Sequence, residues 1–178
     1  MTLELLANQG REKVYSSLAG RNYNDILAKR QNLLNCFGNN VEQEHKRELV
    51  ARIKDVSFVN DARSINPNAT WFSMESVTNK IVWIADVDSK DNNFTCLIPI
   101  AREKVGAMIC FGKERLNLKN TFEGLIHNIF EVNNINEAVM LANAIAESED
   151  VVMYSPANGM EDEIDIKGEG FRHAVNTL

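Results

Sequence analysis

Three short segments rich in Asn, Asp and Ser hold the side chains best suited to binding a small polar ligand. They are residues 60–66, 86–93 and 155–159. Amides, hydroxyls and carboxylates, together with an arginine, can hold a carboxylate or another small polar group by directed hydrogen bonds. The same residue types also cap helices and form turns, so composition alone leaves both interpretations open. The candidate ligand-binding residues are Asn60, Asp61, Arg63, Ser64, Asn66, Asp88, Lys90, Ser155 and Asn158.

Several other kinds of site lack their sequence motif. Phosphate-loop hydrolysis needs GxxxxGK[ST], and dinucleotide binding needs GxGxxG between a strand and a helix; neither pattern occurs. The metalloprotease motif HExxH and the nucleophile elbow GxSxG are also missing. We therefore expect no catalytic residue, and no cofactor bound by the chain itself.

Metal sites are not indicated either. Asp86 opens a segment that begins like a calcium loop, but Lys90 occupies a ligand position and Leu97 stands where the bidentate Glu belongs. The three histidines have no partner at metal-binding spacing, so we expect them to be structural or exposed. They are His45, His127 and His173.

The hydrophobic periodicity predicts the helices and strands that must position these three segments. The pattern is helical over residues 1–44 and then changes to strands that alternate with helices. The expected strands are 48–53 and 56–60 as a hairpin, then 80–87, 105–111, 126–131 and 150–155. The expected helices are 70–77, 94–104, 116–122, one behind the capping pair Asn134 and Glu137, and one over 170–178 after an acidic loop at 161–165.

This order predicts an α/β, Rossmann-like three-layer domain, in which apolar strands form a mostly parallel sheet covered on both faces. We expect about six strands, of which one is antiparallel. The predicted boundaries are a helical N-terminal extension over residues 1–44 and an α/β domain over 45–178. The candidate segments would then follow strands at the carboxyl edge of the sheet, where open α/β sheets bind ligands.

Charge and composition argue against certain classes of binding partner. The net charge is −6 and the basic residues are scattered among acidic ones, which argues against nucleic acid. The N-terminus lacks the apolar core of a signal peptide, and no apolar run is long enough for a membrane helix, so we expect a cytoplasmic protein and no membrane partner. The spacing of Cys36, Cys96 and Cys110 fits buried free thiols.

The same segments carry a resemblance to the C-terminal domain of Mur ligases, and among them to the D-glutamate-adding ligases of peptidoglycan synthesis. Residues 45–66 resemble H-R-x-E-x-V, a hairpin and N-D-S-K-A-T-N; residues 81–90 resemble a strand with its G-G-x-D-K-G loop. Residues 105–113 resemble A-x-x-x-F-G-K/R, and residues 150–157 resemble D-x-V-L-L-S-P-A. A closing helix like G-x-x-F-x-x-x-V follows, so the resemblance covers the chain from about residue 45 to 178.

The resemblance implies a chemistry. In these ligases an ATPase domain phosphorylates a carboxylate, and the amine of an incoming amino acid attacks the acyl phosphate. The C-terminal domain positions that amino acid through the Lys of N-D-S-K-A-T-N and through Ser and aromatic side chains near S-P-A-C-A-S-x-D-x-F.

Several of these positions differ in this chain. Arg63 replaces the Lys, Ile65 replaces the Thr, and Met160 replaces the last Ser of S-P-A-C-A-S. The second loop loses its paired glycines and becomes Asp86-Val87-Asp88. Because these changes fall on the amino-acid pocket, we expect weak or absent binding of D-glutamate. The family residues that this chain retains are Asn60, Asp61, Asn66 and Ser155.

Two functions within this family therefore stay open, beside a third interpretation as an unrelated α/β protein that binds a small ligand. The first is a stand-alone, non-catalytic relative of the C-terminal domain that binds a small polar or amino-acid ligand, or a protein partner, in relation to peptidoglycan precursor synthesis. The second is the C-terminal part of a split D-glutamate-adding ligase that works with a separate Mur-type ATPase subunit. Only in the second would ATP and magnesium take part, held by that subunit.

Overall fold

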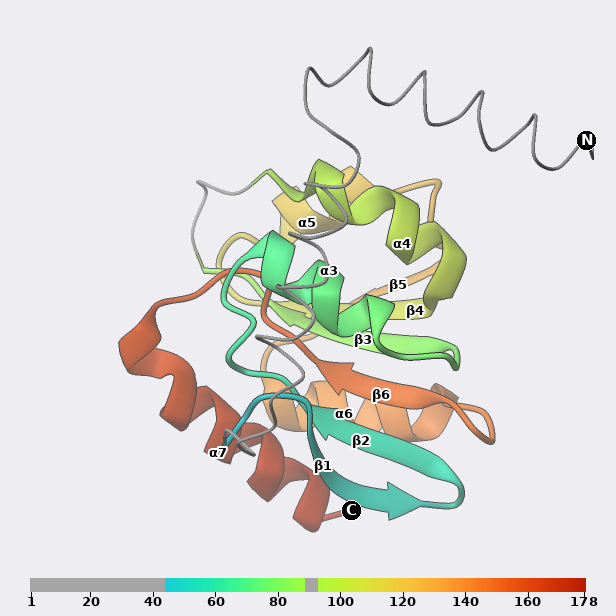
Figure 1. The fold of residues 1–178 in the computed structure, drawn as a ribbon, viewed down its shortest axis with the longest axis vertical. Coiled ribbons are helices and arrows are strands. Elements are labelled where there is room, and N and C mark those ends of the chain that lie inside the picture. Colours follow the sequence, from blue (N-terminus) through green and yellow to red (C-terminus); the bar gives the residue numbers. More distant parts are fainter. Residues whose placement is uncertain (1–43, 89–92) are drawn as a thin grey trace, which may run out of the picture. The chain divides into compact units, whose positions relative to one another are not determined.

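The computed structural model describes residues 44–88 and 93–178, and in them six strands form one sheet between two layers of helices (Figure 1). The strands are β1 (Glu48–Ile53), β2 (Val56–Asn60), β3 (Ile81–Asp86), β4 (Val105–Phe111), β5 (Asn128–Glu131) and β6 (Val151–Tyr154). Their order is β1-β2-β6-β3-β4-β5, with β1 antiparallel to β2 and all other neighbours parallel. The predicted α/β, Rossmann-like class is confirmed. The helices predicted over 1–44 lie outside the described residues, except for Glu44.

Each face of the sheet has its own apolar core and its own helices. The helices are α3 (Pro67–Glu75), α4 (Ile98–Lys104), α5 (Arg115–Phe122), α6 (Ile135–Ile145) and α7 (Ile164–Asn176), with short 3-10 turns η1 (Phe94–Leu97) and η2 (Glu161–Glu163). Trp83 of β3 belongs to the core under α3, α4 and α5, and the next residue, Ile84, to the core under α6 and α7. Successive strand residues point to opposite faces, so a strand buried on both faces reads as a continuous apolar run. Figure 1 shows α7 (red) beside the β1–β2 end of the sheet.

Local sequence signals explain where several elements begin. Lys54 and Asp55, with φ of 49° and 64°, form the tight turn of the predicted hairpin. The Asn66 side chain accepts a hydrogen bond from Ala69 N at 3.0 Å and so caps α3. Asn134 caps α6 in the same way, accepting from Glu137 N at 3.0 Å, which confirms the predicted capping pair.

The prediction for the C-terminal helix was wrong. Residues 161–165 are not an acidic loop: η2 and then α7 begin there, six residues before the predicted start at Gly170. Gly168 lies inside this helix and must be glycine, because a Cβ there would lie 2.4 Å from the His45 ring. Burial of Ile164, Phe171 and Val175 along one face outweighs the low helix propensity of glycine.

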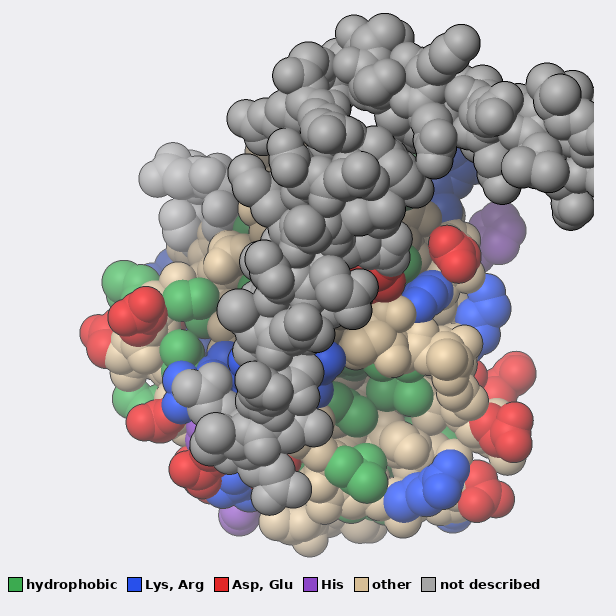
Figure 2. All heavy atoms as spheres, viewed as in Figure 1, with side chains coloured by type: hydrophobic (Ala, Val, Ile, Leu, Met, Phe, Trp, Pro, Cys, Tyr) green, Lys and Arg blue, Asp and Glu red, His purple; other side chains and the backbone are tan. Residues whose placement is uncertain are grey.

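Surface features are consistent with a mixed charge distribution. On the face drawn in Figure 2, Lys and Arg side chains are interspersed with Asp and Glu rather than gathered in one patch. Cys110 is buried as predicted, whereas Cys96 is exposed, because η1 turns it outward; that part of the prediction was wrong. Within residues 44–88 and 93–178, no helix has both the length and the apolar character needed to cross a bilayer.

Gly112, which follows β4, makes the closest backbone approach among the described glycines. Its φ is +93°, and a Cβ there would lie 2.4 Å from the carbonyl oxygen of Val87. That oxygen accepts from Glu114 N at 2.9 Å, so it cannot move away without breaking a bond. Gly124 has a similar φ of +76° but open space around it.

We predict that Gly112→Ala lowers the free energy of unfolding clearly more than Gly124→Ala. Both substitutions place a Cβ in an unfavourable backbone conformation, which costs about 1–2 kcal/mol. Only Gly112→Ala adds a clash with backbone, for which we expect at least about 1 kcal/mol more. Urea unfolding of the two variants and the wild type measures the difference; equal losses would contradict the predicted clash.

Candidate functional site

The candidate site lies at the carboxyl edge of the sheet, where β2, β6 and β3 end side by side. Asn60 pairs with Tyr154 and Tyr154 with Ile84, so the segments after these strands start at the same level. This edge is where open parallel sheets bind ligands. Residues 89–92 of the second segment, and with them Lys90, lie outside the described residues.

A buried carboxylate, Asp61, lies at the centre of this edge. Arg47 N donates to its Oδ1 at 3.2 Å and the Ser155 hydroxyl donates to its Oδ2 at 3.2 Å. Burial raises the pKa of Asp61 to about 6, although hydrogen bonds from Ser64, Ser73 and other donors act in the opposite direction. The hydroxyl and amide donors therefore offset only part of the cost of burying this carboxylate.

Helix α3 supplies two hydroxyls to the same site. Thr70 Oγ1 lies 2.9 Å from Ser155 Oγ, and Ser73 Oγ lies 3.3 Å from Ser64 Oγ. We call Asp61, Ser64, Thr70, Ser73 and Ser155 the Asp61 cluster. The sequence analysis missed Thr70 and Ser73. Their spacing of three residues on the buried face of a helix is the signal that points to them.

The first and third segments are joined directly. Ala157 N donates to Ser64 O at 3.0 Å, and the Ile65 side chain packs against Gly159. Arg63 is half-buried on the rim of this edge, with its Nε donating to Glu44 O at 2.7 Å. In the part of the chain that the structure describes, no partner is assigned to the Nη groups of Arg63.

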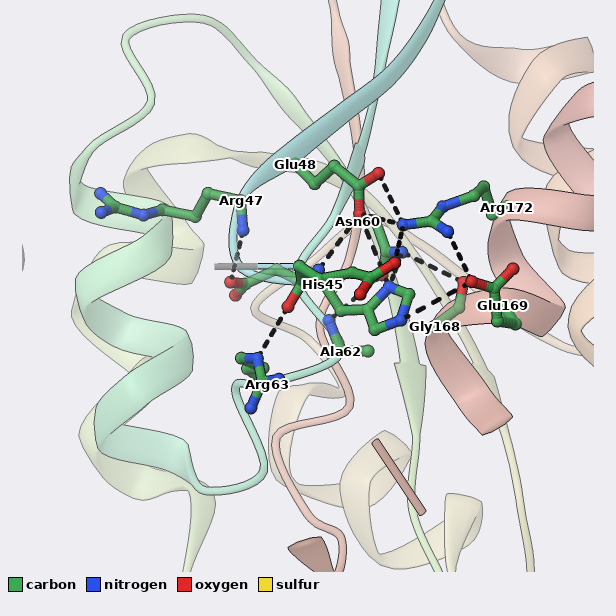
Figure 3. A network of polar contacts seen from close by, with 11 residues as sticks. His45, Arg47, Glu48, Asn60, Ala62, Arg63, Gly168, Glu169 and Arg172 are labelled. Carbon is green, nitrogen blue, oxygen red and sulfur yellow. Dashed lines mark hydrogen bonds and ion pairs between the residues drawn. The ribbon is translucent and has the colours of Figure 1, made fainter. Parts of the chain in front are cut away.

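A second network ties the segment before β1 to α7 (Figure 3). Arg172 of α7 donates to Glu48 at 2.9 Å and to Glu44 at 3.1 Å, and it also pairs with Glu169. Beneath it, buried Asn60 lies between His45 Nδ1, at 2.9 Å, and the carbonyl oxygen of Gly168, at 3.1 Å. We call these residues the His45 network: Glu44, His45, Glu48, Asn60, Gly168, Glu169 and Arg172.

The geometry of this network suits hydrogen bonds better than a metal ion. The ligand atoms of Glu44, His45 and Glu169 lie within 4.8 Å of one another. However, the Asn60 amide is oriented by Gly168 O and by Ala62 N, which donates to Asn60 Oδ1 at 3.3 Å, so its nitrogen donates to His45 Nδ1. The proton of a neutral His45 then lies on Nε2, and the Arg172 guanidinium already occupies both carboxylates.

A third group surrounds Lys167 on the α6/α7 side of the sheet. Its Nζ lies 2.9 Å from Asp86, 3.1 Å from Glu163 and 3.2 Å from Asp88. Burial would lower the pKa of Lys167, but these carboxylates raise it well above its usual range. Tyr154 donates to Asp86 at 3.4 Å. We call Asp86, Asp88, Tyr154, Glu163 and Lys167 the Lys167 cluster.

The structure therefore divides the candidate residues among different environments. Asn60, Asp61, Ser64 and Ser155 come together as buried groups, and Asn158 is buried nearby in the third segment. Asn66 caps a helix, and Asp88 lies with Lys167 instead of with Asp61. The candidate residues did not include Asp86, Tyr154, Lys167 or Arg172. The contacts that bring these side chains together, such as Lys167 with Asp86 and Arg172 with Glu48, join segments that are distant in the sequence.

Comparison with curated proteins finds ligases along the whole chain, although no family model matches it. A UDP-N-acetylmuramoylalanine–D-glutamate ligase of Christiangramia forsetii is 29% identical over 177 residues, covering 97% of this chain and 40% of the relative. A ligase of the same name from Porphyromonas gingivalis is 30% identical over 186 residues, covering 100% of this chain and 40% of the relative. The chain thus spans about two fifths of the length of these relatives.

Solved structures of ligases share the fold. A murein peptide ligase of Psychrobacter arcticus aligns with a TM-score of 0.55 and 10% identity, over 81% of this chain and 32% of that one. A UDP-N-acetylmuramate–alanine ligase of Thermotoga maritima aligns with a TM-score of 0.53 and 12% identity, over 82% of this chain and 36% of that one. At such identities the likeness concerns the fold alone.

Asp61 makes the stability depend on pH. Its pKa is 3.8 in the ordinary state and about 6 in the fold, so the folded protein binds the proton more tightly than the unfolded one. The folded state is therefore favoured most below the lower value, and stability falls as pH rises through the interval. The difference between the two pKa values corresponds to a loss of about 3 kcal/mol in the free energy of unfolding.

We predict that Asp61→Asn removes this fall in stability between about pH 4 and about pH 7. Asparagine has nearly the same shape, and its amide oxygen can still accept from either Ser155 or Arg47, which donate to different oxygens of Asp61, so the fold is expected to persist. Urea unfolding across the interval, with Asp162→Asn in an exposed turn as the control, measures the effect. Parallel stability curves for wild type and Asp61→Asn would contradict the prediction.

Proposed function

The chain belongs to the Mur ligase family, and from this premise we propose that it acts as the C-terminal, amino-acid-positioning module of a D-glutamate-adding ligase. In that reaction the amine of D-glutamate attacks an acyl phosphate made with ATP. The chain has no phosphate-binding loop, so ATP and Mg²⁺ would be held by an ATPase domain. The proposal applies whether that domain is on the same polypeptide or on another.

The observation that carries this proposal is the position of Arg63. Its Nε is held by Glu44 O, which fixes the guanidinium on the rim of the carboxyl edge. Among the described residues none pairs with its Nη groups, and two such groups in one plane suit a carboxylate, which can accept two parallel hydrogen bonds. Arg63 would therefore bind a carboxylate of the incoming amino acid.

The Asp61 cluster would support Arg63 from below. Arg63 N donates to His45 O at 3.1 Å, and Ser64 N donates to Asp61 O at 2.9 Å. The backbone on both sides of the Arg63 peptide is thus fixed to buried groups. A side chain on such a backbone loses less conformational freedom when it binds a ligand, which favours affinity.

A second candidate function, a module that binds without supporting ligation, is favoured by two side chains. Ile65 packs on Gly159, and Met160 is 59% exposed, at positions where the resembling ligases have hydroxyls. Neither side chain can donate a hydrogen bond to a dicarboxylate. Under this alternative the carboxyl edge would bind a different ligand or a protein partner in peptidoglycan precursor synthesis.

A chimera tests the two candidates. The matching C-terminal 40% of the Christiangramia forsetii ligase would be replaced by this chain, and ATP-dependent incorporation of D-glutamate into UDP-N-acetylmuramoylalanine measured. We predict measurable incorporation by the chimera and none by the chain alone. A chimera that binds ATP and the UDP-sugar substrate but forms no product would contradict the ligase proposal.

We predict that Arg63→Ala in the chimera raises the KM for D-glutamate by at least about tenfold, which is about 1.4 kcal/mol. Arg63→Lys should retain part of the affinity, because it keeps the charge but not the paired donors. Arg52→Ala, which removes an exposed arginine of β1, is the matched control. An inactive chimera that gains activity with Ile65→Thr and Met160→Ser would favour the second candidate.

A further inference from the structure

A cavity of about 400 Å³ opens beside the Lys167 cluster, on the face of the sheet opposite the Asp61 cluster. The ends of β3, β4 and β6 form its floor, and the start of α6 and the first turns of α7 form its walls. Its volume lies within the range of sites that hold small molecules. Its lining includes the charged residues Asp86, Asp88 and Lys167 and the apolar residues Phe111, Ile135 and Ile166.

The Asp86 carboxyl has one oxygen left for a ligand. Its side chain is only 7% exposed, and it lines the cavity. Oδ2 accepts from Tyr154 at 3.4 Å and lies 2.9 Å from Lys167 Nζ, whereas none of the described residues donates to Oδ1. Oδ1 is therefore the oxygen that can accept from a ligand in the cavity, and a hydrogen bond between a cation and a carboxylate is stronger than one between neutral groups.

The charges around the cavity favour a cation. The ammonium of Lys167 is shared by three carboxylates, so it has little attraction left for an anion. A divalent metal would need Asp86 and Asp88 together, but Lys167 lies between them at 2.9 Å and 3.2 Å. A monovalent organic cation needs only Oδ1 of Asp86 and leaves the Lys167 pairs intact.

The rest of the wall is apolar. Phe111 and Ile135 line the cavity, and Ile166 at its mouth is 75% exposed. Methylene groups that cover these side chains remove apolar surface from water, worth about 25 cal/mol per Å². The cavity thus combines one acceptor in its floor with apolar walls.

We propose that this cavity binds an aliphatic amine, with the ammonium on Oδ1 of Asp86 and the alkyl chain along Phe111 and Ile135. This site is separate from the rim that holds Arg63 and does not depend on the proposed function. A free amine or a lysine side chain of another protein offers the same chemistry.

Isothermal titration with matched probes tests the proposal. 1,5-Diaminopentane represents a free amine and Nα-acetyl-L-lysine methylamide a protein side chain; glutarate and 1,5-pentanediol match their length without the positive charge. We predict saturable binding of at least one amine and none of glutarate or the diol. No saturable binding of either amine at millimolar concentration would overturn the proposal.

Variants locate the site. We predict that Asp86→Asn weakens amine binding by at least about tenfold, while Glu147→Gln, which removes an exposed carboxylate near the other end of β6, leaves it unchanged. Because Asp86→Asn could disturb Lys167, Gly170→Leu provides a second measure. It adds a side chain at the cavity wall on α7, where a Cβ meets only Ile135 at 3.8 Å. Unchanged amine affinity in both variants would place binding elsewhere and refute the assignment.

Discussion

The insertion of β6 between β2 and β3 determines both the fold and the arrangement of its polar groups. β6 is the last strand in the sequence, yet it pairs with β2 on one side and β3 on the other. Its successive residues point to opposite faces. Ser155, just after the strand, reaches the Asp61 cluster under α3, whereas Tyr154 reaches Asp86 under α7. The end of β6 therefore contributes one side chain to each of two polar sites, which lie on opposite faces of the sheet.

The two sites stabilise a buried carboxylate in different ways. Asp61 has hydroxyl and amide donors, and its pKa rises to about 6 because burial outweighs them. Burial also raises the pKa of Asp86, but Lys167 compensates in part with a hydrogen bond and a charge. The neutral donors around Asp61 fix the backbone near Arg63 but do not neutralise the carboxylate. The ion pairs of Lys167 instead place charged groups at the bottom of the cavity, so binding there depends on whether the ligand is a cation or an anion.

The sequence predicted the framework better than the sites. The hairpin, β4 and the Asn134 cap follow from local patterns, because alternation and capping residues act over a few positions. The start of α7 was missed, since the need for Gly168 arises from His45, more than a hundred residues away. The pairs of Lys167 with Asp86 and of Arg172 with Glu48 were missed for the same reason, because each joins α7 to a strand residue that is distant in the sequence. Predictions for residues 1–43 and Lys90 remain predictions.

The atoms that maintain the fold differ from the atoms that would bind a ligand. This explains how this chain can share its fold with a murein peptide ligase at 10% sequence identity. Parallel pairing of β2, β6 and β3 needs backbone groups and apolar side chains, and both polar sites lie beyond the strand ends. A change from a hydroxyl to Ile65 or Met160 leaves every ladder hydrogen bond in place. The ligand chemistry of this edge can therefore change one residue at a time, and it has to be inferred from Arg63 and Asp86 themselves, because the fold is compatible with more than one answer.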